Sequence, residues 1–152
     1  MLRTTFLSCL TWRLASITWE LISMSKSKFS DKSFNAWLTR YGRAWIEQNP
    51  DAAASLFTAD CPYYDTPFNQ PLSGKEAIHQ YWTKGAKESQ KDIEFSFEAA
   101  RISGVTGYAR WTAKFTRIEN GQRVEIEGFL EAQFNEDVIC TCFREWWHSR
   151  TI

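Results

Sequence analysis

Apolar residues recur at helical spacing over positions 34–45 of the chain. They occupy Phe34, Trp37, Leu38, Tyr41, Ala44 and Trp45. This period predicts an amphipathic helix of about four turns with one face turned toward a core. Asp31 or Ser33 is expected to cap its start, and Asn49-Pro50 is expected to mark its end.

Two shorter helices are predicted after the first one. Asn49 can cap a second helix that has Pro50 at its first position and runs to about residue 57. Ser73 and Glu76 have the spacing of a capping box, so a third helix is expected to begin there and to fade by about residue 85.

After residue 90 the apolar period changes to two, which is the period of a half-buried strand. Apolar and polar residues alternate over positions 93–99, 109–115 and 124–134, and a last strand is expected from about Val138 to Trp147. Asn120-Gly121 is a hairpin signal between two of these runs. Three N-terminal helices followed by an antiparallel sheet predict an α+β domain over residues 31–150.

Residues 1–30 differ from the rest of the chain and are expected to lie outside this domain. Leu7, Leu10, Leu14, Ile17 and Leu21 recur at helical spacing, which fits a targeting or membrane-surface helix. Alternatively, Met24 is the true start of the protein. Contact with a membrane is expected only if this leader is a real targeting segment.

Charge and cysteine content exclude several classes of partner. Lys and Arg together number 18, as do Asp and Glu, and no basic run interleaved with aromatics argues for nucleic acid. The cysteines Cys9, Cys61, Cys140 and Cys142 do not have the spacing of a zinc site, and Cys140 and Cys142 are expected to be small core residues. A cytoplasmic protein without a metal is therefore expected. The 8 tryptophans favour an aromatic-lined cavity or a large aromatic interface.

Asp65 is the first candidate for chemistry. It follows the aromatic pair Tyr63-Tyr64 and precedes Pro67, which cannot donate to a sheet ladder. Asp65 is therefore expected at a strand end, where its aromatic neighbours would shield the carboxylate from water and suit it to proton transfer. The alternative is a turn residue whose side chain bonds its own backbone.

Four segments together resemble a known family over about residues 33–149. They are Leu56-Phe57-Thr58-Ala59-Asp60, Tyr64-Asp65-Thr66-Pro67, Leu72-Ser73-Gly74-Lys75-Glu76-Ala77-Ile78 and Phe143-Arg144-Glu145-Trp146-Trp147. With the order of elements, they resemble the nuclear-transport-factor-2-like superfamily, and more narrowly its SnoaL-like, ketosteroid-isomerase-like branch. The resemblance implies a cone-shaped fold, a curved antiparallel sheet wrapped round three helices, an apolar pocket open at one end, and a homodimer.

The resemblance also implies roles for individual residues. The general base of ketosteroid isomerases falls on Asp65, and the tyrosine of their oxyanion hole falls on Tyr41. Their second oxyanion donor, a protonated aspartic acid, falls on Leu130, which has no proton to donate. This departure argues against steroid isomerisation, because loss of one such donor costs about 10²–10³ in rate.

Glu145 is a further catalytic candidate if the last strand has the right register. A two-residue turn at Glu136-Asp137 would pair Leu130 with Phe143 and Gly128 with Glu145, so that Phe143, Glu145 and Trp147 would face the pocket and Gly128 would leave room for the carboxylate. A three-residue turn would present Cys142, Arg144 and Trp146 instead. Relatives in phenazine biosynthesis that use an acid on this strand favour Glu145.

The remaining candidates would shape a binding pocket. They are Tyr64, His79, Trp82, Trp111, Leu130 and Trp147. Each tryptophan can equally be plain core, and His79 can be a solvated residue. The predicted function is a cofactor-free isomerase, cyclase or dehydratase acting on a small apolar carbonyl compound. The alternatives are a non-catalytic domain that binds an apolar metabolite and a dimeric protein-interaction module.

Overall fold

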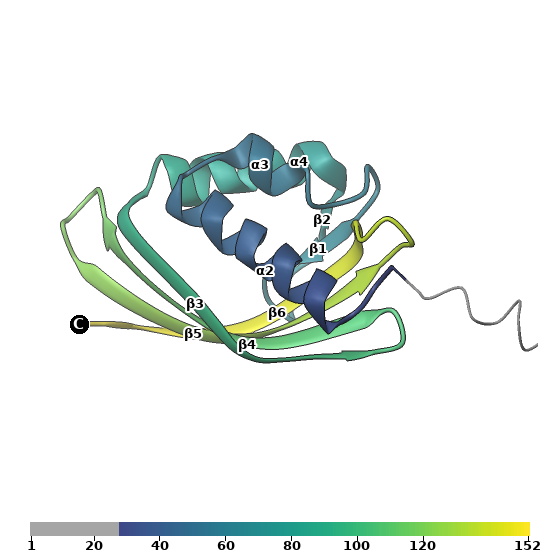
Figure 1. Ribbon diagram of the computed structural model, residues 1–152. Coiled ribbons are helices and arrows are strands. Elements are labelled where there is room, and N and C mark those ends of the chain that lie inside the picture. The colour runs from purple at the N-terminus through teal and green to yellow at the C-terminus, as the bar shows by residue number, and fades with distance from the viewer. Residues whose placement is uncertain (1–27) are drawn as a thin grey trace, which may run out of the picture.

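The computed structural model describes residues 28–152, and its helices lie on the concave face of one curved, unclosed sheet (Figure 1). Helix α2 spans Asp31–Ile46, α3 spans Pro50–Ala54, and α4 spans Gly74–Trp82 and continues as a π-helical turn, η1, at Thr83–Lys87. The α+β class is confirmed. The helices do not form one uninterrupted N-terminal block, because two short strands separate α3 from α4.

The sheet has the order β2-β1-β6-β5-β4-β3. Its strands are β1 (Pro62–Tyr64), β2 (Leu72–Ser73), β3 (Gln90–Ser103), β4 (Thr106–Arg117), β5 (Arg123–Phe134) and β6 (Cys140–Thr151). The four long strands pair antiparallel as predicted. The expectation of a wholly antiparallel sheet is wrong, because β1 runs parallel to β6. Local patterns could not reveal this pair, since its two strands are distant in sequence and joined by a long crossover.

The helix caps explain where the helices begin. Ser30, rather than Asp31 or Ser33, caps α2, and Ser33 completes a capping box with it. Asn49 caps α3 as predicted, accepting the Ala52 N–H at 3.0 Å.

The predicted capping box of α4 does not form. Ser73 makes no side-chain cap hydrogen bond, and Glu76 accepts from Gln80 instead. The Lys75 N–H, which a cap would serve, donates to the carbonyl of Ala59. A main-chain partner thus replaces the side chain that the pattern called for.

The apolar face of α2 packs on the sheet and forms the core. Trp37 is fully buried and contacts the rings of Phe57, Phe134 and Phe143. Phe29 stacks on Phe134 with ring centroids 4.6 Å apart, so the packed domain begins before residue 31. The rest of the proposed leader, including Cys9, lies outside the described residues. Within the described residues no helix is long and apolar enough to cross a bilayer.

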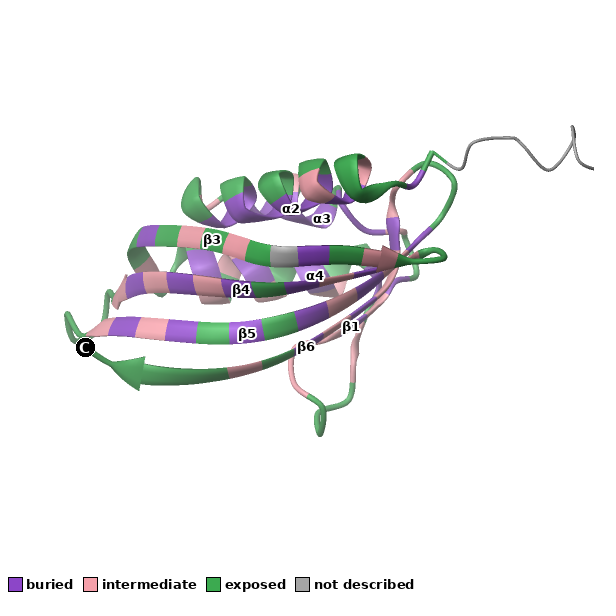
Figure 2. Cartoon of the chain, turned by 60° about the horizontal axis from the view of Figure 1, so that its bottom comes forward, coloured by how far each residue is buried: buried purple, intermediate pink, exposed green. Residues whose placement is uncertain are grey.

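Buried and exposed residues alternate along β4 and β5 (Figure 2). Arg110 faces outward from β4, while Trp111 faces the helices. On β5, Phe129 faces outward and is 46% exposed. The concave face therefore carries the apolar residues, and the convex face carries a mixture of charged and aromatic ones.

Candidate functional site

Glu145 lies on the concave face of β6, at the point where the sheet turns toward the helices. It pairs with Leu130, and Trp147 pairs with Gly128. The predicted face is correct, but the predicted partners are wrong by two residues, because the β5–β6 loop is longer than two residues and a bulge follows Gln133. A shift of two residues changes the partners and preserves the face.

Gly128 makes room for an indole ring rather than for the carboxylate. A Cβ atom at this position would lie 2.6 Å from two ring atoms of Trp111. The expectation that Gly128 accommodates Glu145 is therefore wrong. Trp111 occupies the space over Gly128, and Glu145 lies beside Leu130, two residues further along β5.

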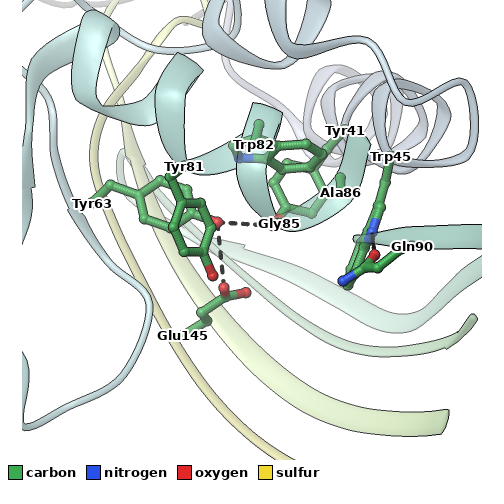
Figure 3. Close-up of a pocket in the computed structure, with 9 residues that line it drawn as sticks. All are labelled: Tyr41, Trp45, Tyr63, Tyr81, Trp82, Gly85, Ala86, Gln90 and Glu145. Atoms are coloured by element: carbon green, nitrogen blue, oxygen red, sulfur yellow. Dashed lines mark hydrogen bonds between the residues drawn. The ribbon is translucent and has the colours of Figure 1, made fainter. Parts of the chain in front are cut away.

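Two phenols lead from the core to the Glu145 carboxyl group (Figure 3). The Tyr63 hydroxyl donates to Oε1 of Glu145 at 3.3 Å, and the Tyr41 hydroxyl lies 3.3 Å from that of Tyr63. Tyr41 comes from α2, Tyr63 from β1 and Glu145 from β6. Since Tyr63 gives its proton to Glu145, Tyr41 is the donor in the bond between the phenols.

The carboxyl group of Glu145 is only 5% exposed. Its pKa is raised to about 8, chiefly by burial; the hydrogen bond from Tyr63 opposes the rise, and the negative charge of Asp65 adds to it. Burial also raises the pKa values of Tyr41, Tyr63 and Tyr81, so these phenols are neutral at physiological pH. At neutral pH the site therefore holds neutral phenols and a carboxyl group that is mostly protonated.

Two adjoining cavities meet at Glu145. The inner cavity has a volume of about 60 Å³ and the outer one about 230 Å³. Both are lined by Trp45, Tyr81, Gln90 and Glu145. The inner cavity is also lined by Tyr41, Tyr63, Trp82, Gly85 and Ala86, and the outer one by Trp111, Phe115, Arg117, Val124, Ile126, Trp147 and Ser149.

The Gln48 side chain anchors the wall that these cavities share. Gln48 ends α2 in a left-handed conformation, and its amide group donates to the carbonyls of Ala86, Lys87 and Gln90. The Trp45 indole donates to the Gln90 side chain at 2.8 Å. These bonds connect η1 and the start of β3 to α2.

Three buried polar atoms at the cavities have no hydrogen-bond partner among the described residues. They are Oε2 of Glu145 and the indole nitrogens of Trp82 and Trp111. A buried polar group left unpaired is costly, so such groups at a cavity indicate a site that a ligand completes.

Comparisons with known proteins identify the family. The family model for the SnoaL-like domain matches residues 38–141, which is more than half of the chain. This chain belongs to the SnoaL-like domain family. No curated protein matches it by sequence.

Solved structures confirm the fold of this SnoaL-like domain. The epoxide hydrolase/cyclase-like enzyme SalBIII, which acts in pyran ring formation in salinomycin, matches with a TM-score of 0.69 and 17% identity, covering 78% of this chain and 95% of its own. A type 2 hexachlorocyclohexane dehydrochlorinase, LinA, matches with a TM-score of 0.69 and 11% identity over 92% and 90% of the two chains. A Bacillus subtilis protein described as a candidate isomerase matches with a TM-score of 0.68 and 15% identity over 79% and 90%.

The SnoaL-like domain does not place Asp65 in the lining of either cavity. Asp65 is half-buried, its Oδ1 accepts from Asn69 at 3.4 Å, and its carbonyl accepts from the Trp147 indole at 2.8 Å. Tyr41, to which the resemblance assigns the oxyanion role, has its hydroxyl group 3.3 Å from that of Tyr63. Asp65 acts on Glu145 and Tyr81 through its charge.

Trp82, Trp111 and Trp147 line the cavities as expected, and three other binding candidates do not. Tyr64 faces away from Tyr63 and lies under the Arg144 guanidinium, 4.8 Å from its ring centre. His79 pairs with Asp51 at 3.2 Å, between α4 and α3. Leu130 is fully buried and lines neither cavity.

Sequence reasoning missed Tyr63, Tyr81, Trp45 and Gln90 as site residues. Tyr63 had a usable signal, because strand alternation puts only one of Tyr63 and Tyr64 on the concave face. Gln90 had none, because it meets Trp45 only through the tertiary fold. Within residues 28–152 no three His, Cys, Asp or Glu side chains are arranged to hold a metal ion.

Proposed function

We propose that this SnoaL-like domain is a cofactor-free enzyme that transfers a proton on a small apolar carbonyl compound, as an isomerase, cyclase or dehydratase does. The observation that carries the proposal is the Glu145 carboxyl group. It is buried at the junction of two cavities, its Oε2 atom has no hydrogen-bond partner among residues 28–152, and its pKa is raised to about 8. A proton-transfer group works best when its pKa lies near the working pH.

The arrangement of the phenols gives Glu145 a defined reactive atom. Tyr63 donates to Oε1, and Tyr41 supports Tyr63 from the core side. Oε2 is left for the substrate. In the ionised form Oε2 takes a proton from a carbon next to the carbonyl group, and in the protonated form it returns that proton to another atom of the substrate.

The outer cavity suits the apolar part of such a substrate. Its walls include Phe115, Val124 and Ile126, and Trp111 adds an indole N–H that can donate to a substrate oxygen. Exclusion of water by these walls strengthens each polar contact inside. The similarity in fold to a cyclase-like enzyme and a dehydrochlorinase is consistent with this assignment.

Asp65 takes a different role from the one that the family resemblance implies. Because its charge helps to raise the pKa of Glu145 and it lines neither cavity, we assign it as a positioning residue that tunes Glu145. Asp65→Asn should then lower the pKa of Glu145 and move the pH profile of the reaction toward lower pH, while leaving turnover in place.

The test is exchange of substrate C–H for deuterium in D₂O, followed by NMR over a panel of small ketones, aldehydes and enones. Glu145→Gln should reduce exchange or turnover by roughly 10²–10⁴. The matched control is Glu119→Gln, an exposed glutamate, which should leave the rate unchanged. If Asp65→Asn abolishes the reaction and Glu145→Gln does not, the roles are reversed.

A non-catalytic binding domain is the second candidate, and Leu130 favours it. Leu130 occupies the position that the resemblance assigns to a second oxyanion donor, and its side chain is fully buried. Ligands that bind wild type and Glu145→Gln equally, with no turnover or exchange for any compound, would establish this function instead.

A further inference from the structure

The inner cavity is an aromatic enclosure around a carboxyl group that forms no ion pair within the described part of the chain. Three tyrosines and two tryptophans line it together with Glu145, and its lining contains no Lys, Arg or His. Figure 3 shows these rings arranged around the space above Glu145. Apart from Glu145, its polar lining is limited to tyrosine hydroxyls, indole N–H groups and the Gln90 amide.

The enclosure becomes negative when Glu145 ionises, at pH values above its raised pKa. The Asp65 carboxylate acts on Glu145, so two acidic groups influence the same small space. The faces of aromatic rings carry partial negative charge and attract cations. The titratable groups that line the inner cavity with Glu145 are Tyr41 from α2, Tyr63 from β1 and Tyr81 from α4, and burial keeps all three neutral. Arg117 from β4 lines the outer cavity and not the inner one.

We propose that the inner cavity binds a small alkylated ammonium cation, with the positive head group enclosed by the rings and in contact with Oε2 of Glu145. Its volume of about 60 Å³ corresponds to roughly four to six water-sized positions, which fits a quaternary ammonium carrying four methyl or methylene groups. Any longer arm of the ligand extends past Glu145 into the outer cavity. A cation bound here would compete for Oε2 with the substrate of the proposed reaction, and its binding is measured independently of catalysis.

Binding of this cation is coupled to release of a proton. Glu145 is mostly protonated at neutral pH, and a cation with no N–H proton to share favours the ionised carboxylate. The affinity should therefore rise as pH increases toward the pKa of Glu145 and become constant above it. From neutral pH to about one unit above that pKa, the affinity should increase roughly tenfold.

The test compares choline with its neutral isostere 3,3-dimethyl-1-butanol, which has the same shape and lacks the charge. Calorimetry and tryptophan fluorescence measure binding to the full chain at several pH values. Wild type should prefer choline by roughly tenfold or more above the pKa of Glu145. Calorimetry in buffers of different ionisation enthalpy should show proton release near neutral pH.

Glu145→Gln should remove the preference for choline and leave binding of the neutral alcohol unchanged. Glu119→Gln should retain the preference, because that residue is exposed and lines neither cavity. Equal affinity for the two compounds, a preference that survives in Glu145→Gln, or no binding of choline would each overturn the proposal. The pH series on wild type decides the matter even if Glu145→Gln fails to fold. None of these results depends on the exchange assay that tests catalysis.

Discussion

Two glutamates on neighbouring strands of the same sheet have opposite environments. Glu125, on the outward face of β5, is paired with Arg150 and Lys114, and the hydrogen bond from Arg150 lowers its pKa. Glu145, on the inward face of β6, has no cationic partner among the described residues, and burial raises its pKa. On the convex face of the sheet Glu125 forms ion pairs, whereas on the concave face the carboxyl group of Glu145 has none within residues 28–152.

The difference separates charges that serve the fold from charges that serve a site. The outward face repeats ion pairs across strands, such as Arg110 with Glu98 and Glu127, and Arg144 with Glu131. Exposed pairs of this kind contribute little stability each and keep the surface soluble. A lone buried carboxyl group costs stability, so its presence on the inward face indicates a use other than folding.

The largest expected effect on stability is the pH dependence that Glu145 imposes. Its folded pKa is raised from 4.5 to about 8, so the folded state holds a proton that the unfolded state loses between these values. Stability should therefore fall as pH rises through this window, by at most on the order of 5 kcal/mol, and level off above it. Denaturant unfolding of wild type and Glu145→Gln across this pH range measures the effect.

Glu145→Gln should flatten that decline and make the domain more stable than wild type at alkaline pH. Glu119→Gln, an exposed site, provides the control and should follow wild type. A Glu145→Gln protein with the same decline as wild type would show that Glu145 is not the titrating group.

The next largest effect compares adjacent residues on the two faces of β5. Gly128→Ala places a Cβ atom 2.6 Å from the Trp111 ring, so the ring must shift, and we expect a loss of about 1–3 kcal/mol. Phe129→Ala removes an outward side chain that is 46% exposed, and it should cost less than about 1 kcal/mol. Chemical denaturation of both variants measures the contrast, and equal losses would contradict it.

We expect two chains to associate through the outward face of the sheet. This association should change the stability of the domain less than the substitutions above, and it should be measurable as a larger mass in solution. Phe129 and Trp146 are paired across β5 and β6, and both are exposed, at 46% and 41%. A mixed polar and aromatic face fits the homodimer that the family resemblance implies. Light scattering should give twice the mass of the chain, and Trp146→Glu should shift it toward monomer. A wild-type monomer at high concentration would make the dimer prediction wrong.

The smallest effect is expected at Glu125. Its lowered folded pKa means that its ion pair contributes stability above the unfolded pKa of about 4.5 and loses it as pH falls through the folded value. Glu125→Gln should therefore cause a slight loss near neutral pH that disappears in acid, opposite in sign to Glu145→Gln. Thermal unfolding at pH values above and below that pKa measures the effect. A Glu125→Gln protein that is more stable than wild type near neutral pH would contradict the prediction.

Local patterns were sufficient for most of the fold. The helical period from Phe34 to Trp45 and the alternation in the long strands depend only on neighbouring residues, and both predictions are confirmed. The parallel pairing of Tyr63 with Phe143 depends on residues distant in sequence, so no local period could predict its direction.

The site was harder to predict because single-residue choices decide it. Pro67 drew attention to Asp65, but β1 ends at Tyr64, so strand alternation does not place Asp65 in the cavity. Glu145 was placed on the correct face although its partner was wrong, because the error was an even number of residues. The raised pKa of Glu145 arises chiefly from burial by side chains of several separate elements, which only the folded chain brings together.

The length of the loop from Asn135 to Ile139 decides which face of β6 is turned toward the cavities. The backbone of this loop closes on itself, with Asn135 bonded to Ile139 and Val138 in a left-handed conformation. Deleting or inserting one codon here would turn β6 over, exchanging Glu145 for Arg144 on the concave side. A two-codon change would return Glu145 to the concave face, displaced by two positions relative to β5. A change in loop length can therefore replace an acidic side chain by a basic one on the concave face without any substitution in β6.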